Sequence, residues 1–399
     1  MLNQDTLREA TRLTQAGQLA EATALLQRMF SGQPTPAAAS PDPGRMRHLG
    51  RTPPTIDLEA NDVGEPNGVA PAKPPTTASR QSRPVFGRAK DGTWLGMRGV
   101  KRAPASMTDI VPEGSQFIEG TYSNSAGTRT YKLFLPSGYR QGHPIPLVVM
   151  LHGCTQSPDD FAAGTRMNFI AEEQTCLVVY PAQRSDANPS KCWNWFRAAD
   201  QRRDEGEPSL IAGITCQIMQ DYSVDSTRMF VAGLSAGGAA AAIMGATYSD
   251  LYAAVGIHSG LAYGVATDMP SAFAAMRQGA SAGRQTIAGG PMVPTIIFHG
   301  DRDSTVHPDN GTQAVKQVIG ATRTQTKVHR GQIPGGHQYT RTTHTAGERV
   351  VLEHWNIHGV GHAWSGGSSA GSYTDPEGPD ATKEMLRFFL ENPSPPQPH

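Results

Sequence analysis

The feature that most constrains the fold is an alternation of short apolar runs with longer helix-like segments from about residue 115 onward. The apolar runs have strand length and lie at residues 131–135, 147–151, 177–180, 228–232, 254–257, 295–298 and 350–353. Predicted helices lie between them at residues 161–173, 210–221, 236–248 and 311–319. Near-continuous apolar strands that alternate with helices are typical of a parallel sheet covered on both faces. Residues 115–390 are therefore predicted to form one α/β domain with a mostly parallel central sheet.

Proline is concentrated outside this predicted domain. Eleven of the 31 prolines lie between Pro34 and Pro84, and four more lie in residues 391–399. Such segments have few large apolar residues whose burial would offset the entropy lost on ordering. We therefore predict that residues 33–114 form a largely disordered linker and that residues 391–399 form a disordered tail.

The first 32 residues have a different pattern. Residues 1–32 carry apolar residues at helical spacing on both sides of Gly17, which predicts a helical hairpin. A single two-helix unit of this kind cannot bury its own apolar face. The hairpin is therefore predicted to be a small appendage, for which docking to an unidentified protein is one role.

Charge and hydropathy argue against two classes of partner. The chain has 35 Lys and Arg against 35 Asp and Glu, and this balance argues against nucleic-acid binding. There is no run of 18 or more apolar residues, so no membrane-spanning helix is expected. The first 30 residues lack the continuous apolar segment of a secretory signal, which favours the cytoplasm. The family resemblance described below is also compatible with an extracellular location.

A pentapeptide of the form G-x-S-x-G marks a candidate nucleophile. The pattern occurs at residues 233–237, 279–283 and 367–371. Only the first copy, with Ser235 at its centre, follows an apolar strand and precedes a run of small helix formers. This strand–turn–helix context is that of a nucleophile elbow, so Ser235 is predicted to be the nucleophile.

An upstream strand points to an oxyanion hole. Residues 147–151 run into a glycine turn at His152, Gly153 and Cys154. In the serine-hydrolase layout, the loop after this strand supplies one backbone N–H to the oxyanion hole. The second N–H comes from the residue after the nucleophile, which is Ala236 here.

Two acids compete for the third catalytic role. Residues 295–298 form an apolar strand that is followed by Asp301 and Asp303. An acid at the carboxyl end of a strand can hold the imidazole of a neighbouring loop, but turn aspartates often serve only local hydrogen bonds. Spacing alone does not choose between the two.

Three histidines near the C-terminus invite a metal-site interpretation. His354, His358 and His362 recur every four residues, as ligands on one helical face would. However, the preceding residues are strand-like, and Gly359 and Gly361 would interrupt a helix. We therefore expect no metal site. His362 instead follows a strand and suits a general base, in the chain order Ser, Asp, His.

Five motifs together indicate a family. They are Leu151-His152-Gly153-Cys154-Thr155-Gln156, Cys192-Trp193-Asn194-Trp195-Phe196, Gly233-Leu234-Ser235-Ala236-Gly237-Gly238, His299-Gly300-Asp301-Arg302-Asp303 and Gly361-His362-Ala363-Trp364-Ser365-Gly366-Gly367. As a set, they resemble the polyhydroxybutyrate depolymerase-type esterases of the α/β-hydrolase fold. The resemblance covers about residues 115–390. It implies an α/β-hydrolase domain, which the predicted hairpin and linker precede.

The resemblance also implies roles for individual residues. By this likeness, Ser235 is the nucleophile, His362 is the base, and Asp303 rather than Asp301 is the acid. The backbone N–H of Cys154 is the upstream oxyanion donor.

The four cysteines fall into two groups. In related enzymes the cysteine of the H-G-C turn pairs with one in the C-W-x-W segment, so the resemblance implies a Cys154–Cys192 disulfide that braces the oxyanion loop. Two free thiols, as expected in a reducing compartment, are the alternative. Cys176 and Cys216 are predicted to be small apolar core residues.

The function that follows is that of a serine carboxylesterase which needs no cofactor. Its expected substrates are hydroxyalkanoate-type esters, either polymeric or small, and Trp193, Trp195 and Trp364 are predicted to line the groove that binds them. Core packing is the alternative for at least one of these tryptophans. The sequence has no export signal and no polymer-binding domain after the catalytic part, which favours short or soluble esters. A feruloyl or acetyl-polysaccharide esterase and a non-catalytic binding protein are the alternative functions.

Overall fold

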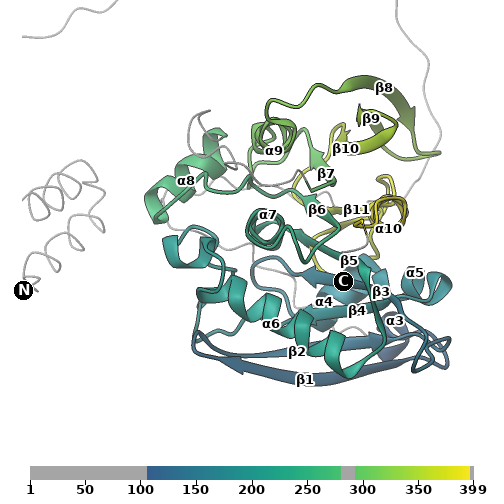
Figure 1. The fold of residues 1–399 in the computed structure, drawn as a ribbon. Coiled ribbons are helices and arrows are strands. Elements are labelled where there is room, and N and C mark those ends of the chain that lie inside the picture. Colours follow the sequence, from purple (N-terminus) through teal and green to yellow (C-terminus); the bar gives the residue numbers. More distant parts are fainter. Residues whose placement is uncertain (1–105, 280–292, 396–399) are drawn as a thin grey trace, which may run out of the picture. The chain divides into compact units, whose positions relative to one another are not determined.

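A computed structural model describes residues 106–279 and 293–395 (Figure 1). The predicted hairpin of residues 1–32 and most of the predicted linker lie outside the described residues, so both stay predictions. Among the described residues, no helix is long and apolar enough to cross a membrane.

The centre of the domain is a ten-stranded sheet with the order β1-β2-β4-β3-β5-β6-β7-β10-β9-β8. In chain order its strands are β1 (Gln116–Asn124), β2 (Gly127–Leu135), β3 (Ile145–Leu151), β4 (Leu177–Pro181), β5 (Val224–Leu234), β6 (Ala254–His258), β7 (Thr295–Gly300), β8 (Gln325–Gln332), β9 (Gln338–Ala346) and β10 (Arg349–Ile357). The six neighbouring strands from β4 to β10 are parallel, whereas β1, β2, β9 and β8 join the two edges antiparallel. The predicted mostly parallel central sheet is confirmed.

Helices cover both faces of this sheet (Figure 1). They are α3 (Met107–Ile110), α4 (Pro158–Thr165), α5 (Met167–Gln174), α6 (Gly206–Asp221), α7 (Ala236–Thr247), α8 (Met269–Gln278), α9 (Asp309–Ile319) and α10 (Ala381–Glu391), with one 3₁₀ turn at Ala198–Gln201. One apolar core packs α6, α7, α8 and α9 against the sheet, and a second packs α3, α4, α5 and α10 against the other face. Because both faces are covered, β3 and β4 are buried along almost their whole length.

The predicted helix at residues 161–173 is in fact two helices. α4 ends and α5 begins at Arg166, whose φ of +56° is in the left-handed region. The guanidinium of Arg166 lies 4.5 Å from the centre of the Phe169 ring. A left-handed residue that is neither glycine nor asparagine gives no sequence signal for a helix end, so the periodicity alone predicted one continuous helix.

The described domain extends beyond both predicted boundaries. Before residue 115, α3 packs Ile110 into the core with only 2% of its surface exposed. After residue 390, Asn392 is buried, and the N–H of Ser394 donates to the carbonyl of Thr227 at 2.8 Å. These flanking residues are therefore part of the packed domain rather than of the linker and tail.

Candidate active site

Loops at one edge of the sheet carry the predicted site residues. The loop after β3 carries Cys154, and Ser235 directly follows β5. Asp303 follows β7, and His362 lies in the loop after β10. Since these strands are parallel and close together in the sheet order, their carboxyl ends share one edge, which is where α/β folds bind ligands.

Ser235 occupies a strained turn between β5 and α7. Its φ of +59° and ψ of −119° are rare for a residue with a side chain, and only 9% of its surface is exposed. The Ser235 N–H donates to the carbonyl of His258 at 2.9 Å. The turn also requires glycine, because a Cβ at Gly237 would lie 1.9 Å from the carbonyl oxygen of Leu151. Such strain persists only where the surrounding structure imposes it, and it is common at catalytic residues.

Asp303 and His362 form a buried acid–imidazole pair. Oδ2 of Asp303 lies 2.7 Å from Nδ1 of His362. The other carboxylate oxygen accepts the backbone N–H groups of Thr305 at 2.9 Å and Val306 at 2.8 Å. Burial alone would raise the pKa of Asp303, but hydrogen bonds from His299 and His362 hold it well below its ordinary value. The carboxylate is therefore ionised and fixed in orientation.

Asp301 pairs with a different histidine. Its Oδ2 lies 2.9 Å from Nδ1 of His358, and its Oδ1 accepts the N–H of Gly359 at 2.7 Å. The side chains of Asp301 and His358 are more than one third exposed, whereas that of Asp303 is fully buried. The structure thus gives each of the two competing acids its own imidazole.

The three regularly spaced histidines do not converge. His354 lies within β10, where burial lowers its pKa to about 4, while His358 and His362 bind different aspartates. In the part of the chain that the structure describes, no group of three or more His, Cys, Asp or Glu side chains could hold a metal ion.

The loop after β3 lies against the nucleophile turn. A Cβ built at Gly153 would lie 3.6 Å from the Cβ of Ser235. The next residue, Cys154, forms a disulfide with Cys192, as the resemblance implied. Ala236 is the first residue of α7, and the N–H groups of a first helical turn have no partner within the helix. The backbone N–H groups of Cys154 and Ala236 thus belong to two adjoining segments beside Ser235.

Residues 129–325 match the family described as "Esterase PHB depolymerase". This segment, just under half of the chain, is similar to that family. The match ends at the first residue of β8, so β10 and His362 lie beyond it.

Curated relatives of the domain carry three different names. It is 33% identical over 227 residues to a poly(3-hydroxyalkanoate) depolymerase C from Paucimonas lemoignei, across 54% of this chain and 54% of the relative. It is 25% identical over 251 residues to acetylxylan esterase A from Talaromyces purpureogenus, across 57% and 62%. It is 27% identical over 236 residues to feruloyl esterase B from Thermothelomyces thermophilus, across 54% and 78%. The chain spans about half the length of the depolymerase.

A solved structure gives the same fold. An acetyl xylan esterase from Aspergillus awamori superposes with a TM-score of 0.54 at 20% sequence identity, over 69% of this chain and 99% of that chain. The α/β-hydrolase fold is thereby confirmed.

The three tryptophans that were predicted to line a groove are buried. Trp193 is 0% exposed, and its Nε1 donates to the carbonyl of His152 at 3.1 Å. Trp364 is 1% exposed, and its Nε1 donates to Oγ1 of Thr382 at 3.0 Å. The prediction that these two side chains line a substrate groove is therefore wrong, because both are packed in the core with their polar atoms satisfied. Trp195, at 7% exposed, is also buried.

The two unpaired cysteines differ in their environments. Cys176 is completely buried, as predicted, and burial raises the pKa of its thiol to about 12. Cys216 lies on the solvent side of α6 and is exposed, so its prediction as a core residue is wrong.

Two buried histidines beside the site had no predicted role. His258 ends β6, its Nε2 accepts the N–H of Ser365 at 3.0 Å, and its ring stacks on Trp364 at 5.0 Å. His299 is the penultimate residue of β7, and its Nε2 donates to the carbonyl of Val306 at 2.9 Å. Both histidines are polar residues at the carboxyl end of a buried strand, and this position in the sequence could have indicated that they lie near the site.

Proposed function

We propose that the chain is a serine carboxylesterase in which Ser235, His362 and Asp303 form the catalytic triad. The observation that carries the proposal is the Asp303–His362 pair, with its 2.7 Å hydrogen bond and fully buried carboxylate. This pair lies at the sheet edge where Ser235 occupies the strained turn after β5. The match of residues 129–325 to the family described as "Esterase PHB depolymerase" supports the same reaction class.

The proposed reaction is acyl transfer through an acyl-enzyme. Because Asp303 holds Nδ1 of His362, the other ring nitrogen is left to take the proton of Ser235. Ser235 Oγ then attacks the ester carbonyl, and His362 protonates the leaving alcohol. Water, activated by the same imidazole, hydrolyses the acyl-enzyme and regenerates the serine.

The oxyanion is held by two backbone donors in this proposal. They are the N–H groups of Cys154 and Ala236, from the loop after β3 and from the first turn of α7. Preorganised donors of this kind stabilise the negative charge that develops on the carbonyl oxygen. The disulfide between Cys154 and Cys192 restrains one of the two donor segments.

Replacement of the nucleophile tests the proposal. Ser235→Ala is expected to abolish turnover of p-nitrophenyl butyrate and labelling by a fluorophosphonate, with the far-UV circular dichroism unchanged. Ser369→Ala is the matched control, because Ser369 is the central serine of the second described G-x-S-x-G pattern and is exposed in a loop. Wild-type turnover by Ser235→Ala would overturn the proposal.

The proposed substrates are hydroxyalkanoate-type esters, in the form of polyhydroxybutyrate, its oligomers or short-chain esters. The 33% identity to a protein named poly(3-hydroxyalkanoate) depolymerase C supports this choice over acetyl or feruloyl esters, for which the named relatives are 25–27% identical. A comparison of kcat/KM on a 3-hydroxybutyrate trimer, an acetylated xylo-oligosaccharide and methyl ferulate tests it. The trimer is expected to give the highest value, and a higher value for the acetyl or the feruloyl ester would favour the alternative of an acetyl-polysaccharide or feruloyl esterase.

A further inference from the structure

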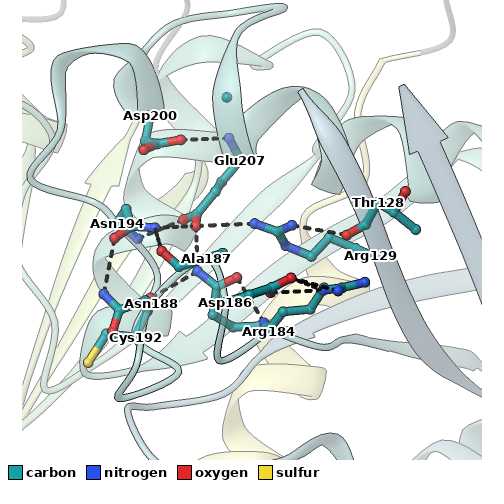
Figure 2. Close-up of polar contacts among 12 residues, drawn as sticks. Thr128, Arg129, Arg184, Asp186, Ala187, Asn188, Cys192, Asn194, Asp200 and Glu207 are labelled. Atoms are coloured by element: carbon teal, nitrogen blue, oxygen red, sulfur yellow. Dashed lines mark hydrogen bonds and ion pairs between the residues drawn. The ribbon is translucent and has the colours of Figure 1, made fainter. Parts of the chain in front are cut away.

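One buried carboxylate near the active-site loops has no part in the proposed reaction. Glu207, the second residue of α6, is 6% exposed and lies close to Asn194, Arg129 and Asp200 (Figure 2). Burial, followed by the charge of Asp200, raises the pKa of Glu207 above its ordinary value. A buried carboxylate lowers the stability of the fold unless hydrogen-bond donors offset its loss of hydration. The donors around Glu207 therefore show what the carboxylate holds in place.

The donors that surround Glu207 are mostly uncharged. The backbone N–H of Asn194 donates to Oε2 at 2.7 Å, and Nδ2 of Asn194 donates to Oε1 at 2.7 Å. Nε2 of Gln183 also donates to Oε1, while the guanidinium of Arg129 is more distant, at 3.5 Å. Both carboxylate oxygens therefore act as acceptors. The groups they fix are the backbone and side chain of Asn194 and the side chain of Gln183.

Gln183 leads from Glu207 to the oxyanion loop. Its Nε2 also donates to the carbonyl of Cys192 at 2.9 Å, and its backbone N–H donates to Nε2 of His152 at 3.1 Å. Nδ1 of His152 donates in turn to the carbonyl of Gly153 at 2.8 Å. His152 begins the oxyanion loop, the segment from His152 to Thr155 that follows β3. Gln183 therefore connects Glu207 both to the start of this loop and to Cys192.

Asn194 gives a second connection to the same loop. Nδ2 of Asn188 donates to Oδ1 of Asn194 at 3.0 Å (Figure 2), and Oδ1 of Asn188 accepts the N–H of Ser190 at 3.0 Å. The carbonyl of Ser190 accepts the N–H of Thr155 at 2.7 Å. The disulfide from Cys192 reaches Cys154 itself. The oxyanion loop is thus held on both sides of residue 154 by a segment that Glu207 anchors.

We propose that Glu207 is a positioning residue which, through Asn194 and Gln183, fixes the backbone N–H of Cys154 where the oxyanion forms. The inference rests on the proposed esterase function. An oxyanion donor must lie within a few tenths of an ångström of its best position, so a displacement of its support lowers the rate without removing the donor. Glu207 acts through the loop and does not contact the reacting atoms.

Glu207→Gln is the direct test, because the amide keeps the shape of the carboxylate and replaces one acceptor oxygen with a donor. Whichever way the amide lies, its NH2 faces an N–H group of Asn194 or Gln183. We expect kcat for p-nitrophenyl butyrate to fall about tenfold or more, with KM changed by less than about twofold, a smaller loss than the roughly 10²–10³ for removal of a whole donor. Affinity for an aliphatic trifluoromethyl ketone, which forms a tetrahedral oxyanion adduct with the serine, is expected to fall by a similar factor.

Glu353→Gln is the matched control. Glu353 in β10 is 4% exposed and accepts hydrogen bonds from Arg387 at 2.8 Å and from Trp355 Nε1 at 3.0 Å. It is likewise a buried carboxylate, here paired with Arg387, and it has no described hydrogen bond to the oxyanion loop or to the segment that holds it. Both substitutions are expected to lower Tm, but only Glu207→Gln is expected to lower kcat and inhibitor affinity.

Asn194→Ala serves if Glu207→Gln does not fold, since it removes one side-chain donor and keeps the backbone N–H to Glu207. It is expected to reduce kcat in the same direction by a smaller factor. Wild-type kcat and inhibitor affinity in the folded variants, or an equal loss in Glu353→Gln, would overturn the inference. A wild-type protein that hydrolyses no ester would overturn it together with the proposed function, whereas active wild type with an unaffected Glu207→Gln would overturn the inference alone.

Discussion

Oδ2 of Asp303 lies 2.7 Å from Nδ1 of His362, and the Asp303 carboxylate is fully buried. Two residues earlier in the same loop, Asp301 makes a similar 2.9 Å contact with His358 at the surface. The two pairs have the same chemistry and differ in burial and in what lies beside them. They therefore provide an internal comparison for the proposed catalytic role.

Asp303→Asn is expected to lower kcat by about 10³–10⁴-fold, because an amide cannot stabilise the imidazolium and favours the wrong tautomer of His362. Asp301→Asn, which removes the same charge from the exposed pair, is expected to keep kcat within about twofold of wild type, as surface ion pairs contribute little. Steady-state kinetics on p-nitrophenyl butyrate checks both. Equal losses in the two variants would contradict the assignment of Asp303.

Loss of the disulfide is expected to affect stability and rate together. Cys192→Ser opens a loop closed across 38 residues, which predicts a loss of about 2–4 kcal/mol of unfolding free energy. It also releases the loop that carries Cys154, so kcat is expected to fall more than KM changes. Cys216→Ser is the control, since that cysteine is exposed and unpaired. Urea unfolding and steady-state kinetics on both variants check this prediction. Equal stability and equal kcat in Cys192→Ser and Cys216→Ser would contradict it.

Acid is expected to destabilise the fold through its buried histidines. Burial lowers the pKa of His152 and of His354 from 6.5 to about 4. Between these values the two histidines bind more protons in the unfolded chain than in the folded one, so their contribution lowers the unfolding free energy as the pH drops from about 6.5 to about 4. Below about 4 their contribution no longer changes.

His354→Gln tests this dependence away from the active site. Removal of one such group is expected to reduce the slope by up to about 1.4 kcal/mol per pH unit within that window. His143→Gln, at an exposed loop position, is measured beside it as the control for the substitution itself. Urea titrations at several pH values give the slopes, and identical slopes for wild type and His354→Gln would refute the assignment.

Close packing at the nucleophile turn predicts a severe effect of a single methyl group. Gly237→Ala places a Cβ 1.9 Å from the carbonyl oxygen of Leu151, which forces strand β3 and helix α7 apart. We expect a loss of about 3 kcal/mol or more of unfolding free energy, or no folded protein. Gly361→Ala is the control, because the nearest atom to its added Cβ is 4.0 Å away. Thermal unfolding of both variants measures the difference.

The sequence was most informative where burial leaves a strong pattern. The inner strand β3 (Ile145–Leu151) is an uninterrupted apolar run because both of its faces are covered. Strand β8 (Gln325–Gln332) was not predicted, because it is exposed along nearly all its length and carries only one large apolar residue, Val328. A strand with no buried face has no hydrophobic period to detect.

The site divides in the same way. The strand–turn–helix context distinguished Ser235 from the other two G-x-S-x-G patterns without any structure. Spacing alone did not choose between Asp301 and Asp303, and the family resemblance implied Asp303; only the fold shows which imidazole each of the two acids faces. The burial of Trp193 and Trp364 could not be predicted from the sequence, because the sequence around a tryptophan does not show whether the ring faces a groove or the core.

The contact between Gly237 and Leu151 has a consequence for efforts to change the acyl preference of this domain. A library that varies residues around Ser235 will lose most of its members if it includes positions 233 and 237, where added atoms meet main chain at 2.3 Å or less. Diversity is better placed outside this turn, for example in the turn before His362, where a Cβ added at Gly361 meets no atom closer than 4.0 Å. Main-chain packing fixes the turn that carries Ser235, so a new acyl specificity has to come from substitutions outside this turn.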